Sequence, residues 1–367
     1  MDKEIQCVLK RIESSGYEAY VVGGYVRDKL LGISSTDIDI ATNALPKDLI
    51  NIFKSYNASI SLYGAFKIIT DKYNFDITTY RKELSYKGRK PDKIEYINNL
   101  LDDIKRRDFT INTICMNSSS TIIDELNGIK DIKDKVIKSV GDPNIKLKED
   151  PLRILRALRF AITLNFSIDR ELLSSIKKNL SLIKTLSYAR KKEELDRILL
   201  SHNAINGLKY LNKLGVLKQL EIKYNHLIYV DDLCGMYAEL EISPNYPFTN
   251  VEKHNINKIK QILKNKKITN QVLFENGLYI SLVAGKILGI DPVKITKMEN
   301  NLPIRSSNNL SLSAIEMMNI LNIKPNKVIK DIQTELINGI LNGKLTNDKD
   351  TLICYIINNR KKWIKNG

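Results

Sequence analysis

Two aspartates separated by a single residue, Asp37 and Asp39, are the side chains in this sequence best suited to chemistry. Ile38 and Ile40 alternate with them, and this period of two predicts a β-strand with both carboxylates on one face. Two like charges so placed repel each other by about 1 kcal/mol in water and by more in a drier site. Because Mg²⁺ prefers carboxylate oxygens together with nucleotide phosphates, the pair indicates a metal site for phosphoryl transfer.

A phosphate-binding segment is predicted directly upstream of this pair. Val21 and Val22 end a short apolar run that is typical of a buried strand, and Gly23 and Gly24 follow it. Glycine lets the backbone approach a ligand closely. The helix expected next would present unpaired N–H groups in its first turn, with Arg27 adding a positive charge. This neighbourhood disfavours the alternative, a solvated pair of aspartates at a strand edge.

Polar and apolar side chains alternate again from Asp108 to Asn112, where Phe109 and Ile111 are the apolar members. We expect a strand here whose polar face holds a ligand, because an unpaired polar group in a buried position costs roughly 1–3 kcal/mol. A ribose is a ligand that such side chains suit. A purely structural Arg–Asp pair is the alternative.

A helix is predicted to begin at Pro151, directly after Asp150. Arg153, Arg156 and Arg159 recur every third residue, so they form one slowly turning stripe of positive charge that an anion would relieve. The acceptor of Asp150 and the forked donors of Arg153 suit the Watson–Crick edge of C or A. The two later arginines would then reach phosphate or the incoming base. A solvated basic face is the alternative.

Four motifs resemble those of the class II tRNA nucleotidyltransferases and bacterial poly(A) polymerases, a branch of the polymerase-β-like nucleotidyltransferases. They are Gly-Gly-x-Val-Arg-Asp-x-Leu-Leu-Gly at 23–32, Asp-Ile-Asp-Ile-Ala-Thr at 37–42, Arg-Arg-Asp-Phe-Thr-x-Asn at 106–112 and Glu-Asp-x-x-Arg at 149–153. The resemblance covers residues 20–200 and weakens beyond them. It implies Mg²⁺-dependent addition of CCA to tRNA 3′ ends from CTP and ATP. A poly(A) polymerase or A-adding relative and an inactive RNA-binding paralogue are the alternatives.

The resemblance also assigns roles to individual residues. Asp37 and Asp39 would hold the metal, and Asp76, on a strand expected at 75–79, would be the third catalytic carboxylate unless it is an ordinary strand-end aspartate. The nucleotide-binding residues that it implies are Gly23, Gly24, Arg27 and Arg107 for phosphate, Asp108 and Asn112 for ribose, and Asp150, Arg153, Arg156 and Arg159 for base or phosphate.

Two stretches fit the family less simply. Residues 82–96 are basic, contain Gly and Pro, and show no helical or strand period, so we expect a mobile loop. The family has a flexible loop in this position, which is needed for adding the terminal A. Residues 187–195 match the family pattern Glu-Arg-Ile-x-x-Glu-Leu only loosely, because Ala189 stands where Glu is expected. The sequence therefore leaves open how that helix is coupled to the base-selecting one.

The order of these signals predicts an α+β protein in three parts. Residues 1–140 are expected to form a polymerase-β-like nucleotidyltransferase head, a mixed sheet with helices, including strands at 19–22 and 65–70. Residues 141–203 would form a helical neck with the nucleotide-selecting helix, and residues 204–367 a helical body and tail.

Apolar stripes in the helical body are expected to be core. They include Ile256, Ile259, Ile262 and Leu263, and a second set of Ile315, Met318, Ile320 and Leu321. The basic faces are expected to follow the acceptor and T arm of tRNA through phosphates and 2′-OH groups, unless they are simply solvated. They include Lys258, Lys260, Lys264, Lys266 and Lys267, and the tail at 360–365.

Composition limits the remaining possibilities. Lys and Arg number 58 against 42 Asp and Glu, which gives a net charge of +16. This charge favours nucleic acid as partner, although a bias towards Lys throughout the chain is the alternative.

The sequence shows no signal peptide at Met1 and no apolar run long enough for a membrane, so a cytoplasmic location is expected. Four dispersed cysteines without a Cys-x-x-Cys pair and only three histidines argue against a zinc site or a disulfide framework.

Overall fold

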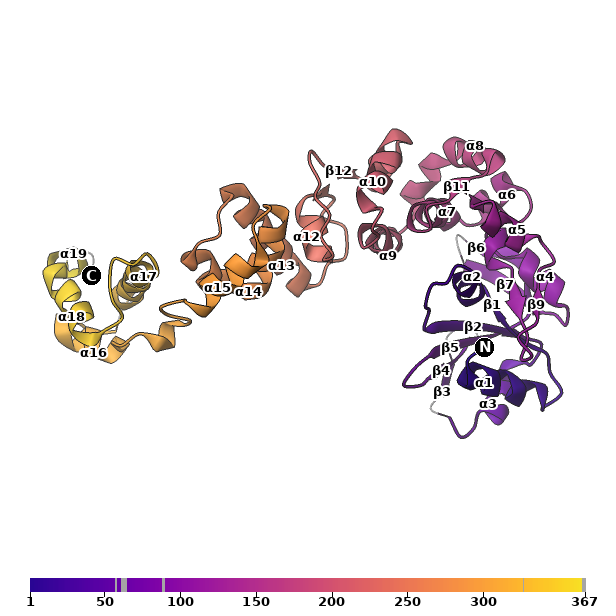
Figure 1. Cartoon of the computed structure of the whole chain (residues 1–367), viewed down its shortest axis with the longest axis horizontal. Helices are drawn as coiled ribbons and strands as arrows, with labels where there is room; N and C mark the ends of the chain where they lie inside the picture. Colours follow the sequence, from indigo (N-terminus) through magenta and orange to yellow (C-terminus); the bar gives the residue numbers. More distant parts are fainter. Residues whose placement is uncertain (57, 61–64, 88–89, 326, 365–367) are drawn as a thin grey trace. The chain divides into compact units, whose positions relative to one another are not determined.

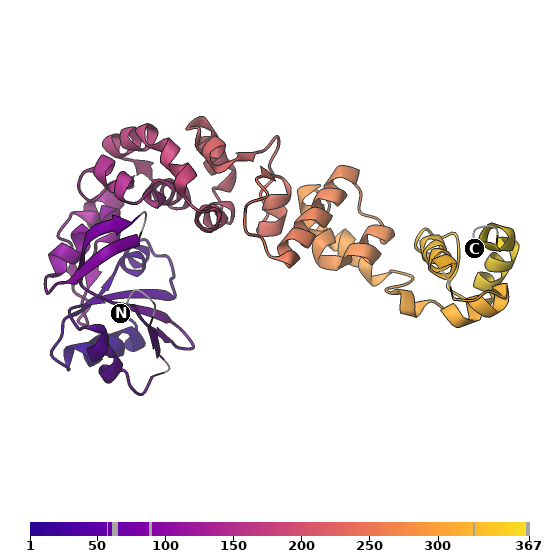
Figure 2. The same cartoon turned by 180° about the vertical axis from the view of Figure 1, so that it is seen from behind.

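The computed structural model of the chain describes residues 1–56, 58–60, 65–87, 90–325 and 327–364. The chain divides into two compact units, Met1–Ile222 and Lys223–Gly367. Figures 1 and 2 show the elements of both units from opposite sides. The boundaries predicted near residues 140 and 203 both fall inside the first unit, and the three-part division stays a prediction.

The first unit combines short strands and helices, which is the α+β class that the sequence predicts. Its strands are β1 (Ala19–Val22), β2 (Asp37–Thr42), β3 (Ala58–Ile60), β4 (Phe66–Ile69), β5 (Asn74–Thr79), β6 (Arg81–Lys87), β7 (Lys90–Tyr96), β8 (Cys115–Met116), β9 (Ile122–Ile123), β10 (Val136–Ile137) and β11 (Ser167–Ile168), and β12 (Ile222–Lys223) spans the boundary. Its helices are α1 (Lys3–Glu13), α2 (Gly24–Leu30), α3 (Pro46–Ile52), α4 (Leu100–Lys105), α5 (Gly128–Lys133), α6 (Pro143–Glu149), α7 (Leu152–Thr163), α8 (Arg170–Lys178), α9 (Tyr188–Leu199), α10 (Ala204–Lys213) and α11 (Val216–Leu220), with 3₁₀ turns η1 (Thr110–Asn112) and η2 (Leu180–Thr185).

A seven-stranded sheet with the strand order β3-β4-β5-β2-β1-β8-β9 organises this unit. β2 runs parallel to β5, with Asp39 opposite Asp76, and antiparallel to β1. α1 packs against α3 and β1, whereas α2 contacts β1 and β2, and Figure 1 draws α2 on the other side of β2 from α1 and α3. Ile38 and Ile40 are buried and Asp37 is exposed, which confirms the predicted two-faced strand.

The segment predicted as a mobile loop at residues 82–96 forms a hairpin instead. β6 and β7 pair antiparallel along their length, except at two register shifts between Glu83 and Tyr86. Such bulges break the alternation of side chains by which a strand is recognised in a sequence. The prediction of a segment without regular structure was therefore wrong. Residues 88 and 89 lie outside the described ones.

The alternating residues at 108–112 form one isolated antiparallel bridge, Phe109 opposite Ser139, followed by the tight turn η1, rather than a continuous strand. The N–H of Asn112 donates to the carbonyl of Phe109 at 2.9 Å. The Asp108 carboxylate accepts from the N–H of Phe109 at 2.8 Å, a local bond that competes with strand pairing. Polar and apolar side chains are consequently buried alike, with Asp108 9% and Asn112 6% exposed. The strand prediction was wrong, but the polar side chains do require buried partners.

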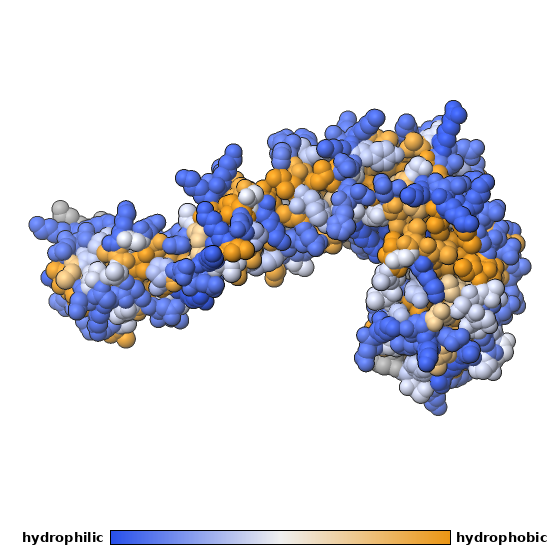
Figure 3. Space-filling model, in the orientation of Figure 1, coloured by the Kyte–Doolittle hydropathy of each residue, from blue (hydrophilic) through white to orange (hydrophobic). Residues whose placement is uncertain are grey.

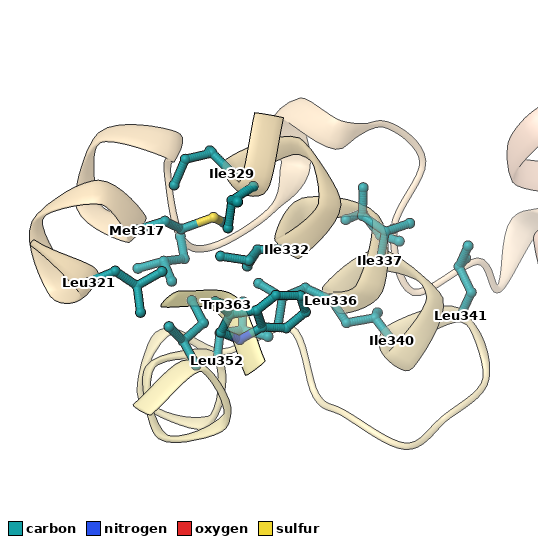
Figure 4. Close-up of a cluster of buried hydrophobic side chains, with 14 residues drawn as sticks. Met317, Leu321, Ile329, Ile332, Leu336, Ile337, Ile340, Leu341, Leu352 and Trp363 are labelled. Carbon is teal, nitrogen blue, oxygen red and sulfur yellow. The ribbon is translucent and has the colours of Figure 1, made fainter. Parts of the chain in front are cut away.

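The second unit is built from helices, as the sequence predicts. They are α12 (Leu233–Ala238), α13 (Asn250–Asn265), α14 (Asn270–Ile287), α15 (Pro292–Asn300), α16 (Ala314–Leu321), α17 (Lys327–Leu341), α18 (Lys349–Asn358) and α19 (Arg360–Ile364), with β13 (Glu241–Ile242) and the turn η3 (Ser307–Asn309). Figure 4 shows an apolar cluster of the last four helices, in which Met317, Ile332, Leu336 and Leu352 are buried around Trp363. None of the helices in the described part of the chain is long and apolar enough to cross a bilayer.

The two predicted apolar stripes of this unit differ in outcome. α13 buries Ile256, Ile259 and Ile262, as expected. In α16, Ile315 is 67% exposed and Met317 is buried in its place. Leu321 is buried as expected, and Met318 and Ile320 pack against the same cluster, so the predicted stripe was wrong only at Ile315.

Glu239 is expected to make the stability of the second unit depend on pH. Its carboxylate accepts the N–H of Ile228 at 3.0 and 3.1 Å, and burial raises its pKa from 4.5 to about 7. The folded state then binds a proton more tightly than the unfolded state. The free energy of unfolding should therefore fall, by at most about 3 kcal/mol, as pH rises from about 4.5 to about 7.

Fluorescence of Trp363, the single tryptophan of the chain, reports urea unfolding of this unit. In Glu239→Gln the amide keeps an acceptor oxygen but does not titrate, so the fall between about pH 5 and about pH 7.5 should largely disappear. An equal fall in both proteins would contradict the assignment.

Candidate active site

One cavity of the first unit, with a volume of about 1140 Å³, is lined by every residue that the sequence singled out. These are Gly23, Gly24, Arg27, Asp37, Asp39, Asp76, Arg107, Asp108, Asn112, Asp150, Arg153, Arg156 and Arg159. Its lining also includes residues that the sequence did not single out, among them Asp28, Lys67, Asn74, Arg81, Arg106, Phe160 and Arg197. The fold thus brings the complete predicted set to one place.

The carboxylates of the cavity lie on neighbouring parallel strands. Asn74 of β5 stands opposite Asp37, and its Nδ2 donates to Asp37 Oδ1 at 3.0 Å, while Asp76 stands opposite Asp39. The pKa of Asp39 is raised, chiefly by desolvation within the cavity and further by Asp76 and Asp37, with Arg107 opposing the shift. A carboxylate repelled by two neighbours in this way is a favourable point for a cation.

These carboxylates fit a divalent ion that takes its other ligands from substrate and water. Among the described residues, no three His, Cys, Asp or Glu side chains converge closely enough to hold a metal by themselves. Asp76 is instead paired with Lys67, whose Nζ lies 3.1 and 3.3 Å from its two carboxylate oxygens. A site with few protein carboxylates completed by phosphates is typical of Mg²⁺.

Gly23 brings the start of α2 against the carboxylates. Its φ of 73° lies in the region that glycine adopts more readily than other residues. A Cβ at this position would lie 3.4 Å from Nη1 of Arg107 and 3.5 Å from Oδ2 of Asp39. A Cβ would thus only be in van der Waals contact with both charged groups, and it is the backbone conformation, with φ 73° and ψ −129°, that favours glycine here.

Arg107 is the cation next to Asp39. Its Nη2 donates to Oδ2 of the buried Asp103 at 3.3 Å, and Asp103 also accepts from Nε of Arg106 at 2.9 Å. Within the described residues, the buried Nε of Arg107 has no hydrogen-bond partner. The guanidinium as a whole lines the cavity, and its positive charge favours an anionic ligand.

A chain of hydrogen bonds connects α2 with η1 and α7. The buried Arg27 donates from Nε to Asp28 Oδ1 at 2.8 Å and from Nη1 to Asn112 Oδ1 at 2.7 Å. Asn112 Nδ2 in turn donates to Asp108 Oδ1 at 3.0 Å, and the other oxygen of Asp108 accepts from Arg156 Nε at 2.6 Å. The polar residues predicted to hold a ribose are thus fixed by one another.

Phe160 of α7 stabilises the arginines of this network. The guanidinium carbons of Arg27, Arg156 and Arg159 lie 4.8, 5.4 and 3.9 Å from the centre of its ring, within the range of cation–π attraction. Burial alone would raise the pKa of Asp108, but its ion pair with Arg156 and its hydrogen bonds outweigh this and lower it. Asp108 is therefore an anion at neutral pH.

Asp150 and Arg153 lie where α6 ends and α7 begins. The carboxylate of Asp150 accepts the N–H of Leu152 at 3.0 Å and so caps the first turn of α7. Arg153 donates from Nη1 to the carbonyl of Lys146 at 3.1 Å and from Nη2 to the carbonyl of Arg106 at 3.2 Å. The guanidinium that the sequence predicts to select a base is consequently held in one orientation.

Arg159, at the far end of the predicted stripe, faces α9. Its Nε lies 2.5 Å from Oε2 of Glu194, and the two side chains are only 9% and 6% exposed. Burial lowers the pKa of Arg159 to about 10, although Glu194 opposes the shift. Glu194 is the final Glu of the loosely matching segment at 187–195, so it supplies the coupling that the mismatch at Ala189 had left unpredicted.

Two sequence families match the chain. The family described as poly A polymerase head domain matches residues 19–138, and that described as probable RNA and SrmB-binding site of polymerase A matches residues 165–224. Relatives match nearly the whole chain. The CCA-adding enzyme of Ligilactobacillus salivarius is 31% identical and that of Limosilactobacillus reuteri 30% identical, each with 94% of both chains covered.

Solved structures share the fold over the same extent. The CCA-adding enzyme of Bacillus stearothermophilus in complex with CTP has a TM-score of 0.86 at 24% identity, covering 100% of this chain and 99% of that one. The CCA-adding enzyme of Thermotoga maritima complexed with tRNA has a TM-score of 0.67 at 19% identity, covering 98% and 96%. The α+β head followed by helices is therefore an architecture that these enzymes share.

Proposed function

This chain belongs to the family of CCA-adding enzymes, the tRNA nucleotidyltransferases, and on that premise we propose that its cavity adds C and A residues to tRNA 3′ ends from CTP and ATP without a template, releasing pyrophosphate. One observation supports this most strongly. The carboxylates of β2 line the same cavity as the buried network of α2, η1 and α7. Transfer of a nucleotide requires such proximity between the metal-binding groups and the groups that hold the substrate.

The nucleotide would bind between α2, η1 and α7. Arg27, Arg107 and the backbone of Gly24 offer positive charge and close approach to the triphosphate, and all three line the cavity. Asp108 and Asn112 would hold the ribose hydroxyls. Because these two are already hydrogen-bonded to each other, their orientation is set before the substrate arrives.

Base selection is proposed for the start of α7. Asp150 offers acceptors and Arg153 offers forked donors, which together suit the Watson–Crick edge of C or A. The carbonyls that hold Arg153 support a fixed orientation for reading that edge. Arg156 and Arg159, tied to Asp108 and to α9, would contact phosphate or base. For one pocket to serve both bases, Asp150 and Arg153 would take a different set of rotamers for C and for A, and the set seen here, with Arg153 bonded to two carbonyls, would be one of the two.

Nucleotidyl transfer in this family is metal-dependent, and we assign Mg²⁺ as the ion. Asp37 and Asp39 would hold it, with Asp76 assisting from β5. When bound, Mg²⁺ would supply activation of the primer 3′-OH and neutralisation of the triphosphate charge. The pKa of Asp39 is raised first by desolvation and further by repulsion from Asp76 and Asp37, and this supports the assignment, since a bound cation would relieve both effects.

Gly23→Ala is expected to lower kcat/KM for nucleotide addition by about tenfold to a hundredfold, because a side chain is strained at a φ of +73° and relief of that strain would shift the start of α2, which lies against Arg107 and Asp39. It should also destabilise the fold by about 1–2 kcal/mol through its positive φ. Gly32→Ala is a matched control, since Gly32 has a φ of +72° and nothing within 4 Å of the added Cβ. Steady-state kinetics and thermal unfolding compare the two. Equal losses of activity would contradict this explanation.

The tRNA acceptor and T arm would contact basic residues of the second unit. Lys264 and Lys266 of the α13 end are exposed, and Figure 3 shows hydrophilic residues over much of the face in view. Lys260 is instead engaged, because its Nζ donates to the carbonyl of Leu240 at 2.9 Å. We therefore leave Lys260 out of the proposed surface. Lys365 of the predicted tail lies outside the described residues.

Incubation of the purified chain with Mg²⁺ and a tRNA ending before CCA tests the proposal. CTP alone should give two added C residues, ATP alone little product, and both together CCA followed by a stop. Long A tails on many RNAs would point to a poly(A) polymerase, and A addition confined to tRNA ending in CC to an A-adding enzyme. Absence of any transfer would leave an inactive RNA-binding paralogue. We place the reaction in the cytoplasm, with the tRNA.

A further inference from the structure

Lys67 lies on β4, on the side of β2 away from β1, and is the cation paired with Asp76. It stands opposite Asp76 in the antiparallel register of β4 and β5, and Asp76 stands opposite Asp39 in the parallel register of β5 and β2. Residues opposite each other on adjacent strands share a face of the sheet. Asp39, Asp76 and Lys67 therefore form a row across three strands, and all three line the cavity.

The contact between Lys67 and Asp76 is easily exchanged. The ammonium lies 3.1 and 3.3 Å from the two oxygens, but the side chains remain 48% and 43% exposed. Ion pairs with this exposure contribute little to stability. The flexible, strongly hydrated ammonium can thus move to another anion at small cost.

The strand order indicates which anion reaches Lys67, given the proposed function. The groups assigned to the nucleotide come from α2, η1 and α7, and α2 lies against β1 and β2. In-line displacement places the attacking 3′-OH opposite the leaving pyrophosphate. β5 and β4 continue the sheet on the side of β2 away from β1. A primer that attacks from opposite the pyrophosphate would therefore approach over these two strands.

We propose that Lys67 binds a backbone phosphate at the 3′ end of the tRNA primer. Without Lys67, the protein side chains of this row that face the phosphate would be the carboxylates of Asp76 and Asp39, beside the proposed Mg²⁺. Lys67 compensates for that repulsion and positions the primer without contacting the incoming nucleotide. The inference rests on the proposed function, because it takes the direction of attack from nucleotidyl transfer.

The test compares Lys67→Met with Lys67→Arg and with a control lysine. Lys72 lies in the turn between β4 and β5 and pairs with Asp2 at 2.6 Å, with 58% of its side chain exposed, but it does not line the cavity. The affinity for tRNA ending before CCA is measured by fluorescence anisotropy at several salt concentrations, and KM is measured separately for tRNA and for CTP.

Lys67→Met is expected to weaken tRNA binding about fivefold, to raise KM for tRNA equally, and to reduce the salt dependence by about one phosphate contact. KM for CTP should not change, Lys67→Arg should retain most of the affinity, and Lys72→Met should behave like the unmodified chain. A loss confined to KM for CTP, or equal effects of Lys67→Met and Lys72→Met, would overturn the proposal.

A double variant separates RNA contact from simple neutralisation of Asp76. If Lys67 only neutralises that carboxylate, Lys67→Met should have no effect on tRNA binding in an Asp76→Asn background. If Lys67 contacts a phosphate, Lys67→Met should weaken tRNA binding in that background as well. Failure of the proposed function looks different. The unmodified chain would then add no nucleotide to tRNA, whereas failure of this inference leaves that addition intact.

Discussion

Asp39→Asn is expected to reduce nucleotide addition by a factor on the order of a thousand or more while the fold remains intact. The carboxylate lies on β2 between Asp37 on its own strand and Asp76 on the next. An amide carries no charge and is a poorer ligand for Mg²⁺ than a carboxylate. Asp37→Asn should have a similar effect. Single-turnover extension of tRNA lacking CCA, with CTP and ATP, measures the loss.

The same substitution should raise the unfolding temperature in metal-free buffer. Desolvation, together with Asp76 and Asp37, raises the pKa of Asp39 above its ordinary value in the folded state. The folded state therefore binds the proton more tightly than the unfolded state, so stability falls as pH rises through this window, and the full penalty is present above it. At neutral pH an amide removes that penalty.

Asp71→Asn, at an exposed position in the turn between β4 and β5, is the matched control and should change neither activity nor stability. Nucleotide addition retained by Asp39→Asn would contradict the metal-site assignment. An unfolding temperature that stays the same or falls would instead contradict the electrostatic account of the carboxylate row, whatever the activity.

Glu194→Ala is expected to destabilise the first unit by about 3–5 kcal/mol, because it leaves the guanidinium of Arg159 buried without its carboxylate. The pair is 2.5 Å apart, with side chains 9% and 6% exposed. The same helix carries a natural control in Arg190 and Glu193, also 2.5 Å apart but 52% and 50% exposed. Glu193→Ala should cost less than about 1 kcal/mol.

Urea unfolding followed by far-UV circular dichroism measures these losses, and Trp363 fluorescence reports the second unit separately. The double variant Arg159→Leu/Glu194→Leu should recover most of the stability, because apolar side chains replace a buried ion pair at little cost. It should nevertheless remain impaired in nucleotide addition, since Arg159 lines the cavity. Equal losses in Glu194→Ala and Glu193→Ala would show that burial does not matter here.

Elements determined by neighbours in the sequence were predicted well. Asp37 and Asp39 alternate with buried isoleucines, and β2 has that pattern. Pro151 precedes α7 as the sequence indicated, and the fold class and the helices of the second unit agree with prediction. The sequence also selected residues from distant segments that the fold gathers around one cavity. Their individual roles stay predictions.

Elements determined by distant partners were not predicted. Phe160 has the sequence pattern of an ordinary core residue, and only the fold shows three guanidinium groups around it. The partner of Arg159, Glu194, is 35 residues away on another helix. The strand assigned at 108–112 was wrong because Asp108 bonds locally to the backbone, and the β6–β7 hairpin was missed because register shifts remove its alternation.

The parallel pairing of β2 with β5 also bears on how the enzyme becomes active during folding. Asp37 and Asn74 are 37 residues apart in the chain. Asp39 and Asp76 are likewise brought together by the parallel pairing of β2 with β5. Non-local parallel pairing costs loop-closure entropy and therefore forms slowly. A nascent chain that has emerged only as far as β2 therefore lacks the assembled carboxylates. Recovery of activity after denaturation should follow closure of the sheet, later than the local formation of helices.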